Sequence, residues 1–75
     1  MNMTLLQKKM LDKGRRDFTN YLGEILSIAP GNASLKFRGK RIWTLEQIKL
    51  VAKELKLTTE DIEEIFDLRG FKDES

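Results

Sequence analysis

The sequence predicts an all-α fold in which residues 1–75 form a single compact domain of five short helices. Apolar side chains recur at spacings of three and four residues, which is the period of a helix packed on one side. Hydrophobic residues make up 40% of the chain and charged residues 35%, a balance typical of a soluble helical protein. A chain of this length holds one small core and leaves little room for a second domain.

The first helix is expected over residues 1–11. Met3, Leu6 and Met10 fall on one face of this segment, and Gly14 is a typical residue for the end of a helix. Flexible methionine side chains fill irregular gaps in a core. We therefore assign the stripe to the core rather than to a binding surface.

Two further helices follow, separated by a short turn. The apolar face of the first comprises Phe18, Leu22, Ile25 and Leu26. Gly23 interrupts this face at a cost of about 1 kcal/mol relative to alanine, so we expect another stretch of backbone to press against it. Pro30 suits the first turn of the second helix, and Gly39 suits its end. Ala33 and Phe37 share one face of that helix and are expected to point inward.

The clearest helical pattern runs from Trp43 to Lys56. Thr44 and Gln47 have the spacing of a capping box, and Trp43 can pack on Ile48 as a hydrophobic staple. The predicted buried stripe is Leu45, Ile48, Val51, Ala52 and Leu55.

The last helix repeats this arrangement, with Thr58 as its cap, Asp61 three residues later, and Leu57 against Ile62. Its first turns carry the carboxylates of Glu60, Asp61, Glu63 and Glu64. The helix dipole stabilises negative charge there, so we interpret the cluster as structural rather than as a metal site. The tail spans about residues 69–75. Leu68, just before it, and Gly70 and Phe71, within it, are expected either to pack on the core or to form a dimer contact.

One set of positions matches a known family in order and spacing: Leu22-Gly23, Leu26, Ala33, Phe37, Gly39-Lys40 and Trp43-Thr44-Leu45. The chain resembles the lambda-repressor-like superfamily of helix-turn-helix proteins, which includes the phage Cro and XRE-type regulators. Alanine is usual in that family at the position of Gly23, and a larger aliphatic residue at the position of Ala33. The resemblance covers nearly the whole chain and implies a five-helix domain whose motif spans about residues 18–39.

Charge is distributed unevenly along the chain. Residues 8–41 contain nine basic and three acidic residues, a balance of +6, whereas residues 42–75 contain five basic and nine acidic residues, a balance of −4. A molecule polarised in this way presents a positive field to an anionic partner with one half of its chain. Because the basic half coincides with the helix-turn-helix motif, nucleic acid is the partner that we expect.

The second helix of the motif would present a polar face with an apolar centre. Its outward and flanking residues are Gly31, Asn32, Ser34, Leu35, Lys36 and Arg38. In the family that the chain resembles, this face enters the major groove of DNA. Side chains of these types pair with base edges there: amides with adenine, cationic groups with guanine or phosphate, hydroxyl groups with several bases, and leucine with the methyl group of thymine.

A second set of residues is expected near the phosphate backbone of DNA. Its side chains are those of Arg15, Arg16, Thr19, Lys40 and Arg41. The resemblance places the two arginines near the entrance of the first motif helix, where related proteins touch phosphates. Backbone N–H groups at the starts of both motif helices also suit phosphate oxygens, and Gly31 leaves room for close approach.

These features predict a small transcriptional regulator of a phage or mobile element that binds operator DNA. A homodimer is expected because one short helix reads few base pairs. The alternative is an antirepressor or modulator that binds a repressor protein through the same face, with Leu35 as an apolar anchor inside a polar rim. A third alternative is a nonspecific DNA-binding or assembly module.

The chain contains no histidine and no cysteine. A structural zinc site, a disulfide framework and thiolate chemistry are therefore not expected, and we expect neither an enzyme nor a bound cofactor. No apolar run is long enough to cross a membrane, and no secretory signal pattern is recognisable. We therefore expect the protein in the cytoplasm of a bacterial host, close to the nucleoid.

Overall fold

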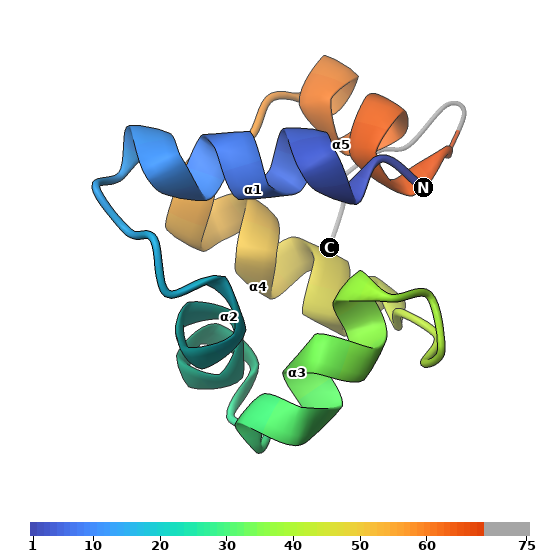
Figure 1. The fold of residues 1–75 in the computed structure, drawn as a ribbon. Helices are drawn as coiled ribbons and strands as arrows, with labels where there is room; N and C mark the ends of the chain where they lie inside the picture. Colours follow the sequence, from blue (N-terminus) through green and yellow to red (C-terminus); the bar gives the residue numbers. More distant parts are fainter. Residues whose placement is uncertain (69–75) are drawn as a thin grey trace.

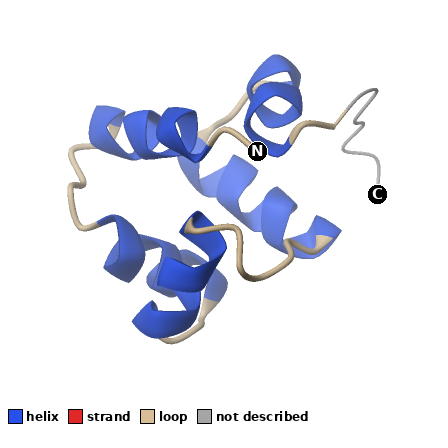
Figure 2. Ribbon diagram, turned by 45° about the vertical axis from the view of Figure 1, so that its right-hand side comes forward, coloured by secondary structure: helices blue, strands red, loops and turns tan. Residues whose placement is uncertain are grey.

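The computed structural model describes residues 1–68, and in that range the regular structure consists of five α-helices (Figure 1 and Figure 2). They are α1 (Met3–Asp12), α2 (Phe18–Leu26), α3 (Pro30–Phe37), α4 (Leu45–Leu55) and α5 (Thr59–Phe66). The predicted all-α, five-helix fold is therefore confirmed. The alternatives predicted for Gly70 and Phe71 lie outside the described residues.

Helix α4 lies between two pairs of helices (Figure 1). On one side of it α1 packs against α5, and on the other side α2 packs against α3. Helix α2 also contacts α4, so the α2–α3 pair is joined to the rest of the molecule through this central helix. The largest fully buried side chains are Leu6, Met10, Leu22, Val51 and Ile65. Because they come from α1, α2, α4 and α5, a single core holds both pairs together.

The start of the chain is tied both to α1 and to the end of α5. The Asn2 side chain accepts a hydrogen bond from the Leu5 N–H (3.1 Å), and the Asn2 N–H donates to the carbonyl oxygen of Ile65 (2.7 Å). Leu6 and Met10 are fully buried, which confirms the predicted core stripe of the first helix. The first residues therefore occupy a defined place beside the last helix.

The turn between α2 and α3 depends on a close approach of two backbone segments. A Cβ atom built on Gly23 would lie 2.8 Å from the carbonyl oxygen of Ile28, closer than real Cβ atoms approach an oxygen. Ser27 ends α2 with a φ of 56°, and Pro30 is the first residue of α3, as expected for a proline. The predicted contact of backbone against Gly23 is therefore confirmed.

Helix α4 begins with the predicted capping box. The Gln47 N–H donates to Thr44 Oγ1, and the Thr44 N–H donates to Gln47 Oε1, both at 3.1 Å. Trp43 and Ile48 are both buried, as a hydrophobic staple requires, and the Trp43 ring meets the Phe66 ring edge-on with centroids 4.9 Å apart.

Leu45 was predicted to belong to the buried stripe of α4, and this prediction is wrong, because Leu45 is 57% exposed. Side chains on a helix lean toward its N-terminus. At the first position of α4, the Leu45 side chain therefore extends beyond the helix start, and Trp43 fills that end of the core instead.

Helix α5 also begins with a capping box, in which Thr58 and Asp61 exchange hydrogen bonds of 3.1 Å. Lys9 on α1 lies near the same carboxylate, with its Nζ 3.4 Å from Asp61 Oδ1. The backbone hydrogen bond from Thr58 is the main cause that holds the pKa of Asp61 below its ordinary value of 3.8, and the Thr58 hydroxyl and Lys9 lower it further.

The close approach at Gly23 predicts opposite effects of one substitution at two helical glycines. Gly23→Ala places a methyl group against a backbone oxygen, so the free energy of unfolding should fall by about 1–3 kcal/mol. Gly31→Ala is the matched control, because nothing lies within 4 Å of its added Cβ, and stability should rise by up to about 1 kcal/mol. Urea unfolding followed by the fluorescence of the single tryptophan measures both; a Gly23→Ala variant as stable as the parent would contradict the prediction.

The lowered pKa of Asp61 predicts a stability contribution that is present near neutral pH and lost in acid. Since the folded-state pKa lies below the unfolded one, the contribution is complete above about pH 4 and disappears as pH falls through the folded pKa. Asp61→Asn keeps the shape of the cap without the charge. It should unfold more easily than the parent by about 0.5 kcal/mol at pH 7, and the difference in stability should shrink as pH falls through the folded-state pKa of Asp61. A pH-independent difference would rule out this origin.

Candidate nucleic-acid interface

The exposed side of α3 matches the prediction except at one residue. Gly31, Asn32 and Arg38 are exposed, and Ser34 and Leu35 are half-buried. On the opposite side, Ala33 is fully buried and Phe37 packs, half-buried, against the core, so the helix is oriented as expected. We call Gly31, Asn32, Ser34, Leu35 and Arg38 the α3 face.

Lys36 was predicted to flank the outward face and to contact guanine or phosphate, and this prediction is wrong. Its residue is only 6% exposed, which makes it the single buried charged residue of the described chain. Together with Ala33 and Phe37, at spacings of three and four residues, it forms the inner side of α3. The pattern did not reveal this because a lysine with buried polar partners has the same sequence signature as an exposed one.

The Lys36 ammonium group fastens the loop after α3, residues 38–42, to the start of α4. Its Nζ donates to the carbonyl oxygen of Ile42 (2.6 Å) and to Gln47 Oε1 (2.7 Å), and it lies 5.1 Å from the centre of the Trp43 ring. Gln47 Oε1 thus accepts from Lys36 and from the capping box of α4. Burial is the main cause that lowers the Lys36 pKa from its ordinary 10.5, and the nearby Arg41 lowers it further.

The 38–42 loop carries the cations that remain available to a partner. Arg38, Lys40 and Arg41 are exposed, and none of them forms an ion pair with another residue in the range 1–68. Arg41 also lines a hollow of about 340 Å³ together with Asn32 of the α3 face. The loop and the first turn of α3 therefore border one continuous surface, with an amide that suits base edges beside a guanidinium group that suits phosphate.

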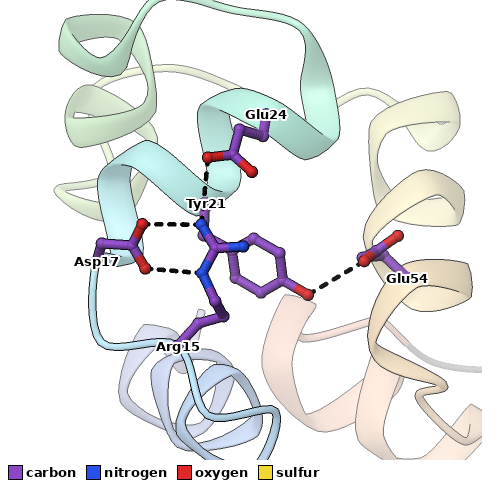
Figure 3. Close-up of polar contacts among 5 residues, drawn as sticks. All are labelled: Arg15, Asp17, Tyr21, Glu24 and Glu54. Atoms are coloured by element: carbon purple, nitrogen blue, oxygen red, sulfur yellow. Dashed lines mark hydrogen bonds and ion pairs between the residues drawn. The ribbon is translucent and has the colours of Figure 1, made fainter.

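At the entrance to α2, Arg15 is surrounded by acidic partners (Figure 3). Its Nε and Nη2 donate to the two carboxylate oxygens of Asp17 (2.9 and 2.8 Å), and Nη2 also reaches Glu24 (3.2 Å). The guanidinium carbon lies 4.1 Å from the centre of the Tyr21 ring, whose hydroxyl donates to Glu54 of α4 (3.2 Å). The chain of contacts thus links the α1–α2 connection to α4.

These contacts change the role that the sequence suggested for Arg15. The hydrogen bond with Asp17 is the main cause that raises the pKa of Arg15 and lowers the pKa of Asp17, so both groups stay charged and paired. With two carboxylates around one cation, this region is unfavourable for a phosphate, and we remove Arg15 from the interface. Arg16 is exposed and Thr19 is half-buried, and both remain candidates.

Sequence reasoning missed one groove beside the 38–42 loop. It has a volume of about 570 Å³ and is bordered by residues 1–4 and 36–42. Ile42 on its edge is 83% exposed, more than any other large hydrophobic residue of the described chain. The sequence does contain a signal for this groove: Ile42 belongs to no helical stripe and comes directly after Lys40 and Arg41.

Comparison with protein-family models, curated proteins and solved structures finds no match to this chain. The similarity to lambda-repressor-like proteins therefore stays a prediction from the motif residues. Among residues 1–68, no helix is long and apolar enough to span a membrane. The same part of the chain has no group of three acidic side chains arranged to hold a metal ion.

The buried ammonium group predicts different costs for two substitutions of Lys36. Lys36→Ala removes the buried aliphatic stem and both hydrogen bonds, so the free energy of unfolding should fall by about 2–3 kcal/mol. Lys36→Met keeps an apolar stem and avoids the cost of burying a charge. Its free energy of unfolding should therefore fall by less than about 1 kcal/mol. Urea unfolding separates the variants, with Lys40→Ala as the exposed control. Equal stability of Lys36→Ala and Lys40→Ala would contradict the role of Lys36.

Proposed function

We propose that this protein is a DNA-binding transcriptional regulator that places the α3 face in the major groove and holds the phosphate backbone with the 38–42 loop. One observation carries the proposal: α3 follows α2 through a tight turn, and its exposed face continues into a loop with three cations that have no ion pair within residues 1–68. A short exposed helix is of a size to enter the major groove. Operator DNA is thus the proposed partner.

The distribution of charge supports a particular way of docking. Arg38, Lys40 and Arg41 follow the C-terminal end of α3, whereas Arg15 near the start of α2 is neutralised. The loop therefore offers phosphates a cluster of three cations, and Asn32 lies beside it. We infer that the loop sets the register on the phosphate backbone while Asn32 and Ser34 contact bases.

A single α3 helix reads few base pairs, so the proposal includes a homodimer on a two-fold symmetric operator. The motif resemblance supports a phage or mobile element as the source of the regulator. Such a role implies a protein that works in the cytoplasm on DNA of the host nucleoid.

A second candidate function is the modulator that binds a repressor protein. Leu35 supports it, because this large apolar side chain is half-buried on the otherwise polar α3 face and is not among the residues packed against the core. An apolar group inside a polar rim is typical of a protein contact. In this case Leu35→Asp should abolish an effect on repressor binding to DNA and leave the fold intact.

The DNA-binding proposal predicts how affinity depends on salt. The chain is titrated with duplex from upstream of its own gene and with random duplex, at several salt concentrations. Selective binding should weaken with salt, and Arg38→Ala, Lys40→Ala and Arg41→Ala should each reduce the slope of log K against log salt by about 1. Lys53→Ala is the matched control, because this exposed lysine lies near the other end of α4.

Three results would count against DNA binding through this surface. The first is an affinity that does not depend on salt, and the second is a Lys53→Ala variant that changes the slope as much as the loop variants do. The third is a lack of selective binding by the chain alone, combined with a change in the repressor's affinity for DNA that Leu35→Asp removes. That third result would establish the modulator.

A further inference from the structure

The groove beside the 38–42 loop lies between two segments that are far apart in sequence. Residues 1–4 form one wall and residues 36–42 the other, and they enclose about 570 Å³. Figure 1 shows the N-terminus and the loop after α3 on the same side of the molecule. A volume of this size accommodates one or two large side chains of a partner. We call it the N-terminal groove.

The apolar part of the N-terminal groove is unusually exposed. Ile42 is 83% exposed and Met1 63%, the two highest values among the large hydrophobic residues of the described chain. Met3 and Phe37, both half-buried, line the same groove. Apolar surface of this kind in water marks a place where a partner gains free energy by covering it.

The charged side chains of the groove are all basic. Arg38, Lys40 and Arg41 line it without an ion pair inside residues 1–68, and none of its lining residues is acidic. Lys36 also borders the groove, but its ammonium group is already bonded to Ile42 and Gln47. The charge of the rim is therefore complementary to a carboxylate-rich partner.

We propose that the N-terminal groove binds an acidic segment of a partner protein that inserts a large apolar side chain. Carboxylates of the segment pair with the three cations, and its apolar side chain covers Ile42 and Met1. DNA held at the α3 face would pair with the same cations and lie over Ile42, which also borders the hollow beside Asn32, but it would leave Met1 in water. The observations therefore favour a protein segment as the occupant.

The groove overlaps only in part with the surface proposed to read bases, because Lys36, Arg41 and Ile42 also border the hollow beside Asn32. Gly31, Asn32 and Leu35 do not line it, whereas Arg38, Lys40 and Arg41 belong both to the groove and to the proposed DNA contact. An acidic partner in the groove therefore competes with DNA for the same cations. This competition rests on the proposed function, but binding of the acidic segment does not.

The test uses the full chain and two labelled synthetic peptides of twelve residues. One contains eight glutamates and four leucines, and in the other serine replaces each leucine. Fluorescence anisotropy should show saturable binding of the leucine peptide and about tenfold weaker binding of the serine peptide. Ile42→Ser should weaken binding of the leucine peptide about fivefold to tenfold, because an apolar contact is lost. Leu45→Ser, the matched control outside the groove, should leave binding unchanged.

Unchanged urea-unfolding midpoints of both variants ensure that a loss of binding is not a loss of fold. The proposal is overturned if the leucine peptide does not bind, if both peptides bind equally, or if Ile42→Ser and Leu45→Ser behave alike.

A second experiment tests the competition with DNA, and in it unlabelled duplex from upstream of the gene is added to the peptide complex. Displacement of the peptide supports the competition, and a ternary complex overturns it. If the duplex does not bind the chain at all, the proposed function fails while the peptide result stands.

Discussion

The buried ammonium group of Lys36 joins three parts of the molecule. It extends from the inner side of α3, bonds the backbone of the 38–42 loop at Ile42, and shares Gln47 with the capping box of α4. A buried charge is unfavourable unless it is paired or hydrogen-bonded, so the loop must stay where its carbonyl group reaches Lys36. This buried group, together with the hydrogen bond from the Lys40 N–H to the carbonyl oxygen of Leu35 (2.8 Å), holds the exposed cations of the loop beside α3.

The two ends of the α2–α3 unit differ in whether their cations are available to bind an anion. At the α2 end, Asp17 and Glu24 neutralise Arg15, and Tyr21 carries the contact onward to Glu54 on α4 (Figure 3). The cation at this end is therefore already paired with carboxylates of the same molecule. At the α3 end, the cations of the loop have no such partners among residues 1–68. A phosphate or a carboxylate is therefore attracted to the loop side of the motif.

The proposed DNA contact and the N-terminal groove share the cations of one short loop. A charge that serves two surfaces cannot be paired by both partners at once, so binding at one surface lowers the affinity at the other. The groove adds the exposed apolar side chain of Met1, which lies outside the hollow beside Asn32 and therefore distinguishes a protein segment from DNA. The two proposals thus give one small domain two partners, and the 38–42 loop is the part of the surface that they have in common.

The sequence by itself determined the five helices, the capping boxes of α4 and α5, the turn at Gly23 and the inward direction of Ala33, because periodicity, capping and glycine are local signals. The tertiary structure alone decided which charged residues are available. Lys36 is buried because Gln47, eleven residues away, supplies an acceptor. Arg15 is paired with Asp17, two residues away, and the fold adds Glu24 from the following helix. A lysine or an arginine has the same pattern in a sequence whether it faces water, a carbonyl oxygen or a carboxylate, and only packing assigns it one of these neighbours.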